Sequence, residues 1–172
     1  LSAVPGRMER VGQDGAAPLA LVDYAHTPDA VTQALSALQS LARQRGGQLW
    51  CVLGCGGDRD PGKRPLMAAA AQAMADHVVL TSDNPRSESP QAILDQMVVG
   101  LTDPSAAQVV IDRAEAIALA VSRAQAADVV LVAGKGHEDY QDVQGVRLPF
   151  SDVQQLQAAL QVRFANARGV RA

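Results

Sequence analysis

Charged side chains of both signs gather in four short segments, each of which follows a run of apolar residues. Arginine can bind a carboxylate through two parallel hydrogen bonds, and aspartate and glutamate can accept hydrogen bonds from an ammonium group. A mixture of both therefore suits a zwitterionic ligand such as an amino acid. The four segments are residues 23–28, 54–64, 82–86 and 134–139. The charges of the last three are Asp58, Arg59, Asp60, Lys63, Arg64, Asp83, Arg86, Lys135, Glu138 and Asp139.

A second interpretation of these charges is a set of solvated ion pairs on the protein surface. Exposed pairs contribute only ~0–1 kcal/mol each to stability, and for any single pair this interpretation is favoured. The histidines in the segments, His26 and His137, are likewise more typical of side chains that bind a backbone carbonyl than of groups that act on a substrate. The residue types alone leave both interpretations open.

Two glycine patterns in these segments look like phosphate-binding loops but are incomplete. Residues 57–63 fit the G-x-x-x-x-G-K spacing, in which backbone amides surround phosphate groups. Arg64 follows where a serine or threonine hydroxyl should hold magnesium, so the pattern fails as a P-loop. The G-x-G-x-x-G dinucleotide pattern lacks its third glycine, at Arg59 in one segment and at Asp139 in another. Such loops are equally typical of plain turns at strand ends.

Five apolar runs rich in Val, Leu and Ile predict five strands. The runs do not alternate with polar residues, which is typical of strands covered on both faces in a parallel sheet. They comprise residues 19–22, 49–53, 78–80, 109–111 and 129–132. Capping side chains or first-turn prolines predict helices that begin near Thr27-Pro28, Lys63, Ser89-Pro90 and Asp112. The pattern predicts an α/β fold with a doubly wound, mostly parallel, Rossmann-like sheet and helices on both faces.

The predicted sheet gives the charged segments a common location. In open parallel sheets, ligands bind beyond the carboxyl ends of the strands, which is where each segment begins. We therefore expect the segments to meet along one edge of the sheet. Asp112, which follows the remaining strand and precedes Glu115, is interpreted as a helix N-cap.

The two ends of the chain complete the predicted organisation. Residues 146–150 predict a sixth strand at an edge of the sheet, followed by a last helix from Ser151 with one apolar face. Residues 1–15 predict a junction with a neighbouring domain, and residues 16–172 predict the domain itself. Residues 165–172 predict a frayed tail.

Composition excludes several other classes of protein. With 172 residues, 48% of them apolar and 19% charged, the chain predicts one soluble domain with a substantial core. A net charge of −3 argues against a general attraction to nucleic acid or membranes. The absence of a signal-peptide layout and of an apolar run of ~18 residues predicts a cytoplasmic location. Cys51 and Cys55 are interpreted as buried thiols, and the start at Leu1 predicts a piece of a longer protein.

Taken together, these motifs closely resemble the C-terminal domain of the Mur ligase family, and within it the members that add meso-diaminopimelate. The resemblance covers residues 4–152, in the family's order and approximate spacing. It rests on V-P-G-R-M-E at residues 4–9, V-D-Y-A-H-T-P-D at residues 22–29, residues 54–65, D-N-P-R at residues 83–86, and residues 134–140.

The resemblance implies a step of peptidoglycan synthesis. In the family, ATP and Mg²⁺ activate the D-glutamyl carboxylate of UDP-N-acetylmuramoyl-L-alanyl-D-glutamate as an acyl phosphate, and the amine of the incoming amino acid attacks to form an amide. The implied partners are therefore meso-diaminopimelate, ATP and the UDP-linked dipeptide. Nucleic acid and membrane are not expected as partners, and a monomer is expected.

The resemblance also implies roles for individual residues. Those that match the family's meso-diaminopimelate positions are Arg59, Asp83, Asn84, Pro85, Arg86, Gly134 and Glu138. Arg7, Asp23 and His26 match positions that approach ATP, with Arg7 near the terminal phosphate and Asp23 near the ribose. Lysine-adding relatives lack the arginine that matches Arg86, which is physically reasonable because lysine has no distal carboxylate. No catalytic residue and no metal ligand is expected in this domain alone.

The family's full enzyme also has an N-terminal domain for the UDP sugar and a central ATPase domain. Neither has a counterpart in these 172 residues, so the chain alone should be inactive. Mg²⁺ and most of the ATP molecule would be bound by the central domain. The related folate polyglutamate ligases share the fold, but nothing suggests that they carry D-N-P-R in this form.

Two other functions stay open at this point. A noncatalytic small-molecule-binding or docking module could have kept the fold and lost the chemistry, although the joint presence of Arg7, Arg86 and Glu138 argues against it. An independent nucleotide-binding enzyme would need a complete phosphate loop, which the sequence lacks.

Overall fold

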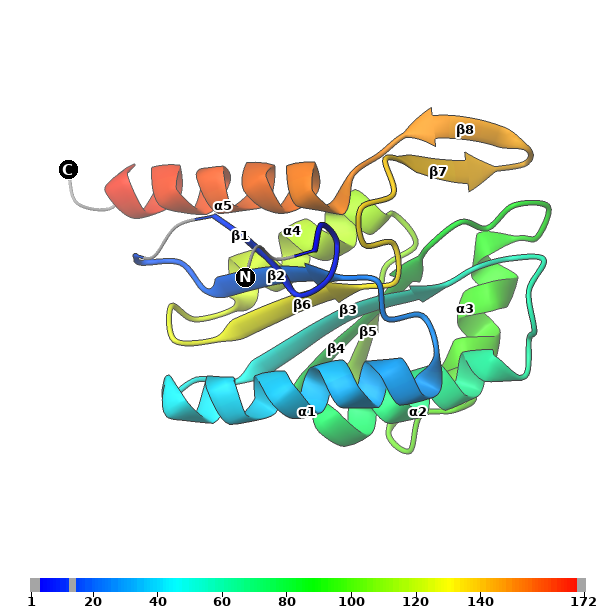
Figure 1. Cartoon of the computed structure of the whole chain (residues 1–172), viewed down its shortest axis with the longest axis horizontal. Coiled ribbons are helices and arrows are strands. Elements are labelled where there is room, and N and C mark those ends of the chain that lie inside the picture. Colours follow the sequence, from blue (N-terminus) through cyan, green and yellow to red (C-terminus); the bar gives the residue numbers. More distant parts are fainter. Residues whose placement is uncertain (1–3, 13–14, 170–172) are drawn as a thin grey trace.

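A computed structural model describes residues 4–12 and 15–169 of the chain. Six strands form one sheet in the order β1-β2-β6-β3-β4-β5, in which β1 is antiparallel to β2 and the other neighbours are parallel. Helices cover both faces (Figure 1), which confirms the predicted doubly wound α/β fold. The strands are β1 (Glu9–Val11), β2 (Leu19–Asp23), β3 (Leu49–Cys55), β4 (His77–Ser82), β5 (Ala107–Val109) and β6 (Val129–Ala133).

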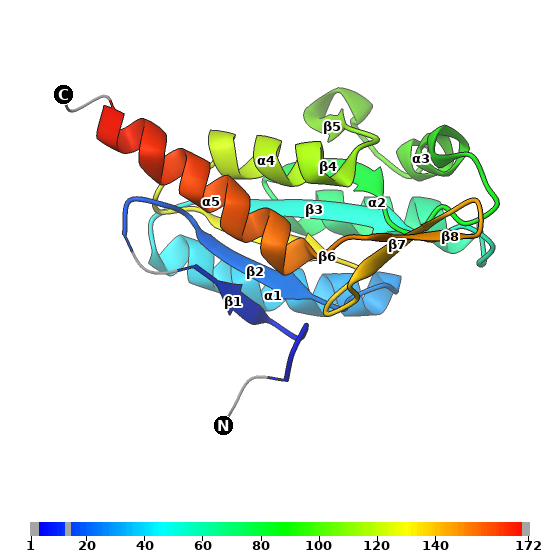
Figure 2. The same cartoon turned by 90° about the horizontal axis from the view of Figure 1, so that it is seen from above.

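The helices begin where the capping signals predict them. The side chains of Thr27, Ser89 and Asp112 each accept a hydrogen bond from a backbone N–H of the first turn. Helices α1, α2 and α3 pack on one face of the sheet, and α4 and α5 pack on the other (Figures 1 and 2). They are α1 (Pro28–Gln44), α2 (Lys63–Met74), α3 (Pro90–Val98), α4 (Arg113–Arg123) and α5 (Asp152–Gly169), with a short 3-10 helix η1 (Pro104–Ala106).

The sixth strand of the sheet is not the predicted one. β8 (Val146–Pro149) pairs with β7 (Tyr140–Val143) in a separate antiparallel hairpin, so the prediction of an edge strand at residues 146–150 is wrong. The edge is occupied by β1, inside the segment predicted as a junction. Turn chemistry explains the hairpin, because Gln144 and Gly145 have φ values of 53° and 78°, which a tight two-residue turn requires.

Two boundaries also differ from the prediction. The strand expected at residues 109–111 lies slightly earlier, because the backbone register with β4 ends at Val109 and apolar composition does not report register. Helix α5 continues to Gly169, through most of the predicted tail, and residues 170–172 of that tail lie outside the described residues. The predicted apolar face of this helix is confirmed by the burial of Leu156 and Leu160.

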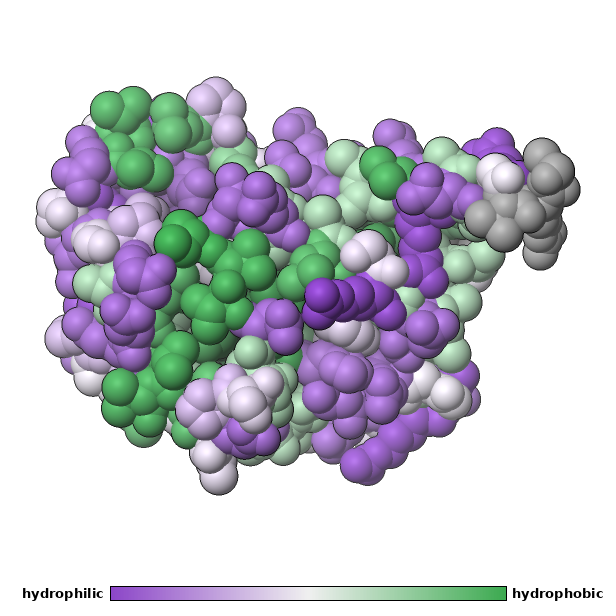
Figure 3. Space-filling view, turned by 180° about the vertical axis from the view of Figure 1, so that it is seen from behind, coloured by the Kyte–Doolittle hydropathy of each residue, from purple (hydrophilic) through white to green (hydrophobic). Residues whose placement is uncertain are grey.

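The core consists of two apolar layers, one on each face of the sheet. All residues of β3 and β6 are buried, which confirms that continuous apolar runs mark the central strands. β5 forms one edge of the sheet, and its last residue, Val109, and the nearby Ile111 remain 43% and 46% exposed. Apolar side chains gather on this side of the molecule (Figure 3). Among the described residues, no helix has the length and apolar character to cross a bilayer.

A buried ion pair joins α4 to α5. Arg113 Nε and Nη2 donate to the two carboxylate oxygens of Asp152, each at 2.8 Å, and both side chains are fully buried. The same guanidinium donates to the carbonyls of Ser82 and Ala133, each at 3.0 Å. These carbonyls belong to the last residues of β4 and β6, where two of the charged segments begin. The pair therefore supports the edge of the sheet from which the candidate site is built.

Both cysteines are buried thiols, as predicted. Burial raises the pKa of Cys51 and of Cys55 to about 12, so the reactive thiolate is nearly absent at neutral pH. We expect iodoacetamide at about pH 8 to modify neither thiol in the native protein and both in concentrated guanidinium chloride, as counted by mass spectrometry. Rapid labelling of native protein would contradict this burial.

The raised pKa values also predict a pH dependence of stability. Because the thiols ionise near pH 9.0 in the unfolded chain, the free energy of unfolding should fall as the pH rises from there toward 12.

Candidate functional site

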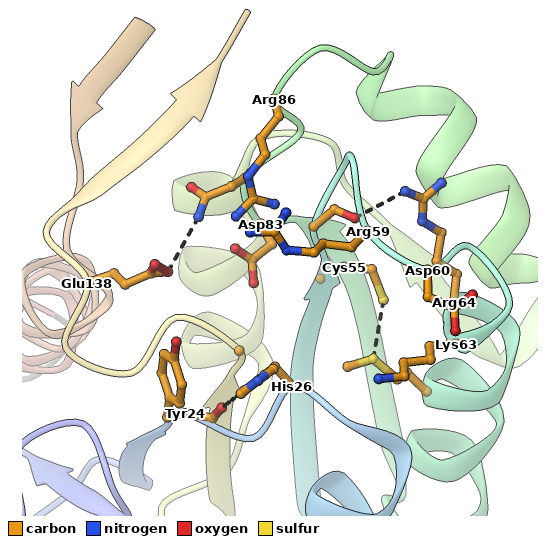
Figure 4. Close-up of a pocket in the computed structure, with 15 residues that line it drawn as sticks. Tyr24, His26, Cys55, Arg59, Asp60, Lys63, Arg64, Asp83, Arg86 and Glu138 are labelled. Carbon is orange, nitrogen blue, oxygen red and sulfur yellow. Dashed lines mark hydrogen bonds between the residues drawn. The ribbon is translucent and has the colours of Figure 1, made fainter. Parts of the chain in front are cut away.

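A pocket of about 520 Å³ opens beyond the carboxyl ends of β2, β3, β4 and β6. β6 lies between β2 and β3 in the sheet. After β3 the chain turns to the face of the sheet that α2 covers, whereas after β6 it turns to the face that α5 covers (Figure 1). Loops that depart to opposite faces leave a crevice between them. All four charged segments line this pocket (Figure 4), so the prediction that they meet along one edge is confirmed.

The pocket brings together most of the predicted site residues. Those that line it are His26, Arg59, Asp83, Asn84, Arg86, Gly134 and Glu138. Arg7, Asp23 and Pro85 are not part of the lining. Asp23 and Pro85 directly precede or follow lining residues in the chain, and the Arg7 guanidinium lies 5.7 Å from the ring centroid of Tyr24, which lines the pocket. The lining also includes Tyr24, Asp60, Lys63 and Arg64. The ligand contacts assigned to these residues stay predictions.

The two candidate carboxylate-binding arginines flank Gly56. A Cβ atom on Gly56 would lie 2.7 Å from Arg86 Nη1, so any other residue here would displace the Arg86 guanidinium, whereas Arg59 Cγ at 3.7 Å would be in ordinary contact. Arg86 is half-buried, and its Nη1 donates to the Gly57 carbonyl at 2.7 Å. That bond uses one of five guanidinium donors. Arg59 is exposed, and its Nη1 donates to the Asp58 carbonyl at 3.1 Å.

The segment of residues 83–86 is held in place by the β7–β8 hairpin. The Arg86 N–H donates to the Asp142 carbonyl at 2.9 Å, and the Gln144 N–H donates to the Arg86 carbonyl at 2.8 Å. The Gln141 side chain donates to the Asp83 carbonyl at 2.7 Å. The sequence reasoning missed this role of the hairpin, because it assigned β8 to the main sheet. The turn at residues 144–145 was the available signal.

The loop after β6 brings a third group of charges to the pocket. Gly134 has a φ of +116°, and a Cβ there would lie 2.7 Å from Asp83 Oδ2, so this position requires glycine. The next residue, Lys135, is fully buried, and its Nζ lies 3.7 Å from Asp83 Oδ1 and 3.5 Å from Glu138 Oε1. The interpretation of Lys135 as a surface charge is wrong, because the loop turns it inward. The burial of Lys135 could have been predicted from its place two residues after the fully buried strand β6.

Arg64 is likewise not a surface charge. It is 1% exposed, and its Nη1 and Nη2 donate to Glu88 Oε1 and to the Gly56 carbonyl, each at 3.1 Å. The hydrogen bond from Arg64 lowers the pKa of Glu88, which also accepts from the Asp58 N–H at 2.7 Å. The Ser87 hydroxyl lowers the pKa of Asp58 in the same way. These bonds fix the loop that carries Arg59.

Asp23 connects the N-terminal segment to the loop after β2. Its Oδ2 accepts from the Met8 N–H and its Oδ1 accepts from the Ala25 N–H, each at 2.8 Å. Asp23 is 8% exposed, so it is a structural tie as well as a candidate ligand. This hydrogen bond holds Arg7, which directly precedes Met8, close to Tyr24 in the pocket lining.

Tyr24 is the centre of a small aromatic cluster at that edge. The Arg7 guanidinium lies 5.7 Å from the Tyr24 ring centroid, and the His26 ring packs edge-on at 4.7 Å. His26 Nδ1 lies 2.7 Å from the Tyr24 carbonyl, and since a carbonyl only accepts, Nδ1 donates. The carbonyl-binding interpretation of His26 is therefore confirmed. Because the ring is exposed, its Nε2 side can still meet a ligand.

Comparison with known proteins decides the family. A family model described as "Mur ligase, glutamate ligase domain" matches residues 6–136, from the turn before Arg7 to the loop that carries Lys135. The chain belongs to this Mur ligase family. The match includes all four segments up to Gly136.

The relatives of this Mur ligase domain include a UDP-N-acetylmuramoyl-L-alanyl-D-glutamate--2,6-diaminopimelate ligase from Acidovorax sp. (strain JS42). It is 59% identical over 160 residues, which are 93% of this chain and 32% of the relative. A solved structure of a ligase with the same name superposes with a TM-score of 0.83 at 48% identity, covering 95% of this chain and 33% of the other. This chain therefore spans about a third of these relatives.

A more distant structural neighbour of this chain carries ligands. It is a bifunctional folylpolyglutamate synthase/dihydrofolate synthase with Mn, AMPPNP and L-glutamate bound, which superposes with a TM-score of 0.56 at 25% identity. The superposition covers 77% of this chain and 29% of that structure. Within residues 4–12 and 15–169 of this chain, no three His, Cys, Asp or Glu side chains are grouped to hold a metal ion.

Proposed function

We propose that this chain is the amino-acid-recognition domain of an ATP-dependent ligase that adds meso-diaminopimelate to UDP-N-acetylmuramoyl-L-alanyl-D-glutamate. The observation that carries the proposal is the mixed charge of one cavity, which Arg59 and Arg86 line together with Asp83 and Glu138. The names of the relatives that span this domain support the reaction. In the same proposal, residues 16–172 are the recognition domain and residues 1–15 are its junction.

The proposed ligand has a carboxylate and an ammonium group at each end. We assign the distal carboxylate to Arg86, whose planar fork can donate two parallel hydrogen bonds. The distal ammonium falls to Asp83 and Glu138, which accept hydrogen bonds. L-Lysine offers the distal ammonium without the carboxylate and would leave Arg86 unpaired. The pocket thus discriminates by the charges at one end of the amino acid.

The remaining predicted residues have supporting roles in this proposal. Arg59 lines the pocket and its side chain is exposed, so it can change its rotamer to bind a second carboxylate. Asn84 offers hydrogen bonds from the pocket wall. Pro85 restricts the backbone between the two ligand-facing residues of its segment. Gly134 lets the loop after β6 approach Asp83 closely.

ATP is the second substrate of the proposed reaction, and it would face Arg7, Asp23 and His26. The chemistry of these groups fits a nucleotide, because Arg7 supplies an exposed cation for phosphate and each Asp23 oxygen keeps a second lone pair for a ribose hydroxyl. Mg²⁺ and most of the ATP would be held by the central domain of the full-length ligase. Together they activate the D-glutamyl carboxylate as an acyl phosphate, which the amine of the bound amino acid attacks.

Calorimetric titration of the full-length ligase tests this function. We expect meso-diaminopimelate to bind at least ~100-fold more tightly than L-lysine, because a site built on polar recognition rejects an analogue that leaves its charges unpaired. Equal affinity for the two amino acids would contradict the proposed specificity. Binding of neither would favour the noncatalytic module.

The isolated chain is the control for the role of the other domains. It should neither hydrolyse ATP nor form an amide, because its G-x-x-x-x-G-K segment continues into the buried Arg64 instead of a magnesium-binding hydroxyl. Turnover by the isolated chain would show that the domain carries catalytic machinery of its own.

A further inference from the structure

We propose that Lys135 is a positioning residue that turns the side-chain amide of Asn84 so that its nitrogen, and not its oxygen, meets the ligand. The inference rests on the proposed function, because it states how one wall of the amino-acid pocket is set. Lys135 is not a lining residue of the pocket, whereas Asn84 is. Lys135 can therefore influence how the ligand is contacted only through the residues that it touches, which include Asp83, Asn84 and Glu138.

The orientation of Asn84 follows from two hydrogen-bond donors that share one acceptor. Lys135 Nζ lies 2.9 Å from Asn84 Oδ1, and the backbone N–H of Asp142 donates to the same oxygen, also at 2.9 Å. An ammonium group and a backbone N–H can only donate. If the amide were reversed, its NH₂ group would face both of them, and two hydrogen bonds, one of them fully buried, would be lost. The oxygen is therefore held on the protein side.

The amide nitrogen then lies toward the acidic side of the pocket. Asn84 Nδ2 is 3.4 Å from Glu138 Oε1, a long contact that leaves most of its donor capacity for a ligand. Asn84 itself is only 2% exposed, so its amide cannot reorient freely in water. A donor at this place suits a carboxylate oxygen of an amino acid and disfavours a second ammonium group.

Lys135 also lies close to two acidic residues of the pocket lining. Its fully buried Nζ lies 3.5 Å from Glu138 Oε1 and 3.7 Å from Asp83 Oδ1. One ammonium group thus holds three of the residues that the proposed function assigns to the amino acid. Lys135 lies in the loop after β6, whereas Asp83 and Asn84 follow β4, so this contact fixes two loops relative to each other.

The first test replaces Lys135 with Met in the full-length ligase, which keeps most of the length of the side chain and removes its ammonium group. We expect the KM for meso-diaminopimelate to rise on the order of 10-fold to 100-fold, with a much smaller change in kcat. Arg123→Met is the control, because it removes an exposed charge at the far end of α4. An unchanged KM in Lys135→Met would overturn the proposal.

A double-mutant cycle separates positioning from general loss of structure. If Lys135 acts through Asn84, adding Lys135→Met to Asn84→Ala should raise the KM by less than ~3-fold further, because the contact is already gone. Independent effects that multiply in full would contradict the proposal. The melting temperatures of the same four proteins should show the same coupling without any ligand.

The second test, Asn84→Asp, does not depend on the stability of the lysine variant. Aspartate keeps the shape of the side chain and the oxygen that Lys135 and the Asp142 N–H bind, but it presents an oxygen to the pocket in place of NH₂. We expect the KM to rise at least as far as in Asn84→Ala. Tolerance of Asn84→Asp would mean that an acceptor already faces the ligand. Failure of the wild-type ligase to use meso-diaminopimelate would instead contradict the proposed function, and the ligand-free melting data would still test the Lys135–Asn84 contact.

Discussion

Arg86→Ala in the full-length ligase should raise the KM for meso-diaminopimelate about 100-fold, which corresponds to ~2.8 kcal/mol of binding free energy. The guanidinium is half-buried and held by the Gly57 carbonyl at 2.7 Å, so its fork is already oriented before the ligand arrives. The variant should also narrow the discrimination against lysine. It should not make lysine a good substrate, because the substitution removes a contact to meso-diaminopimelate and adds none to lysine. Steady-state kinetics with both amino acids measures both effects.

Two further variants make this result specific to Arg86. Arg86→Lys keeps the charge but loses the planar fork, so its KM should fall between those of the wild type and Arg86→Ala. Arg43→Ala removes an exposed arginine near the end of α1 and should leave the KM unchanged. The KM for ATP should stay near its original value in all three. If Arg86→Ala kept both affinity and selectivity, Arg59 would become the next candidate for the distal carboxylate.

Asp152→Ala should lower the free energy of unfolding by ~3–5 kcal/mol, because it leaves the buried Arg113 charge without its carboxylate. Burial alone would lower the pKa of Arg113, but the Asp152 charge and hydrogen bonds outweigh it and raise that pKa. For a chain of this size, the loss corresponds to a melting temperature about 10 °C lower. Urea unfolding and a thermal melt of the isolated chain measure both quantities.

The matched control for this pair is the double variant Arg113→Met/Asp152→Leu. Removing both charges leaves no buried charge without a partner, so the double variant should recover much of the stability lost in Asp152→Ala. If the double variant were as unstable as the single variant, packing and not the unpaired charge would explain the loss. The carbonyls of Ser82 and Ala133 would lose their donor in the double variant, so its meso-diaminopimelate affinity also reports on support of the pocket edge.

The local elements and the family could be predicted from the sequence. Continuous apolar runs marked β2, β3, β4 and β6, because strands covered on both faces have no polar side to show. Thr27, Ser89 and Asp112 marked helix starts, because each cap is a bond between residues three positions apart. The carboxyl ends of parallel strands share one edge, so the meeting of the charged segments also followed from the strand pattern.

The pairing of residues far apart in the chain could not be predicted from the sequence. The edge position of β1 and the separate hairpin of β7 and β8 depend on backbone pairing, which the composition of a short strand does not encode. Lys135, Arg64 and Arg113 look like surface charges in the sequence, yet each is buried. Charged side chains are buried only where partners surround them. The partners here come from distant parts of the chain: Asn84 for Lys135, Glu88 for Arg64 and Asp152 for Arg113. The residue types show that these side chains can form such bonds, but only the fold brings each charged side chain and its partner within hydrogen-bond distance.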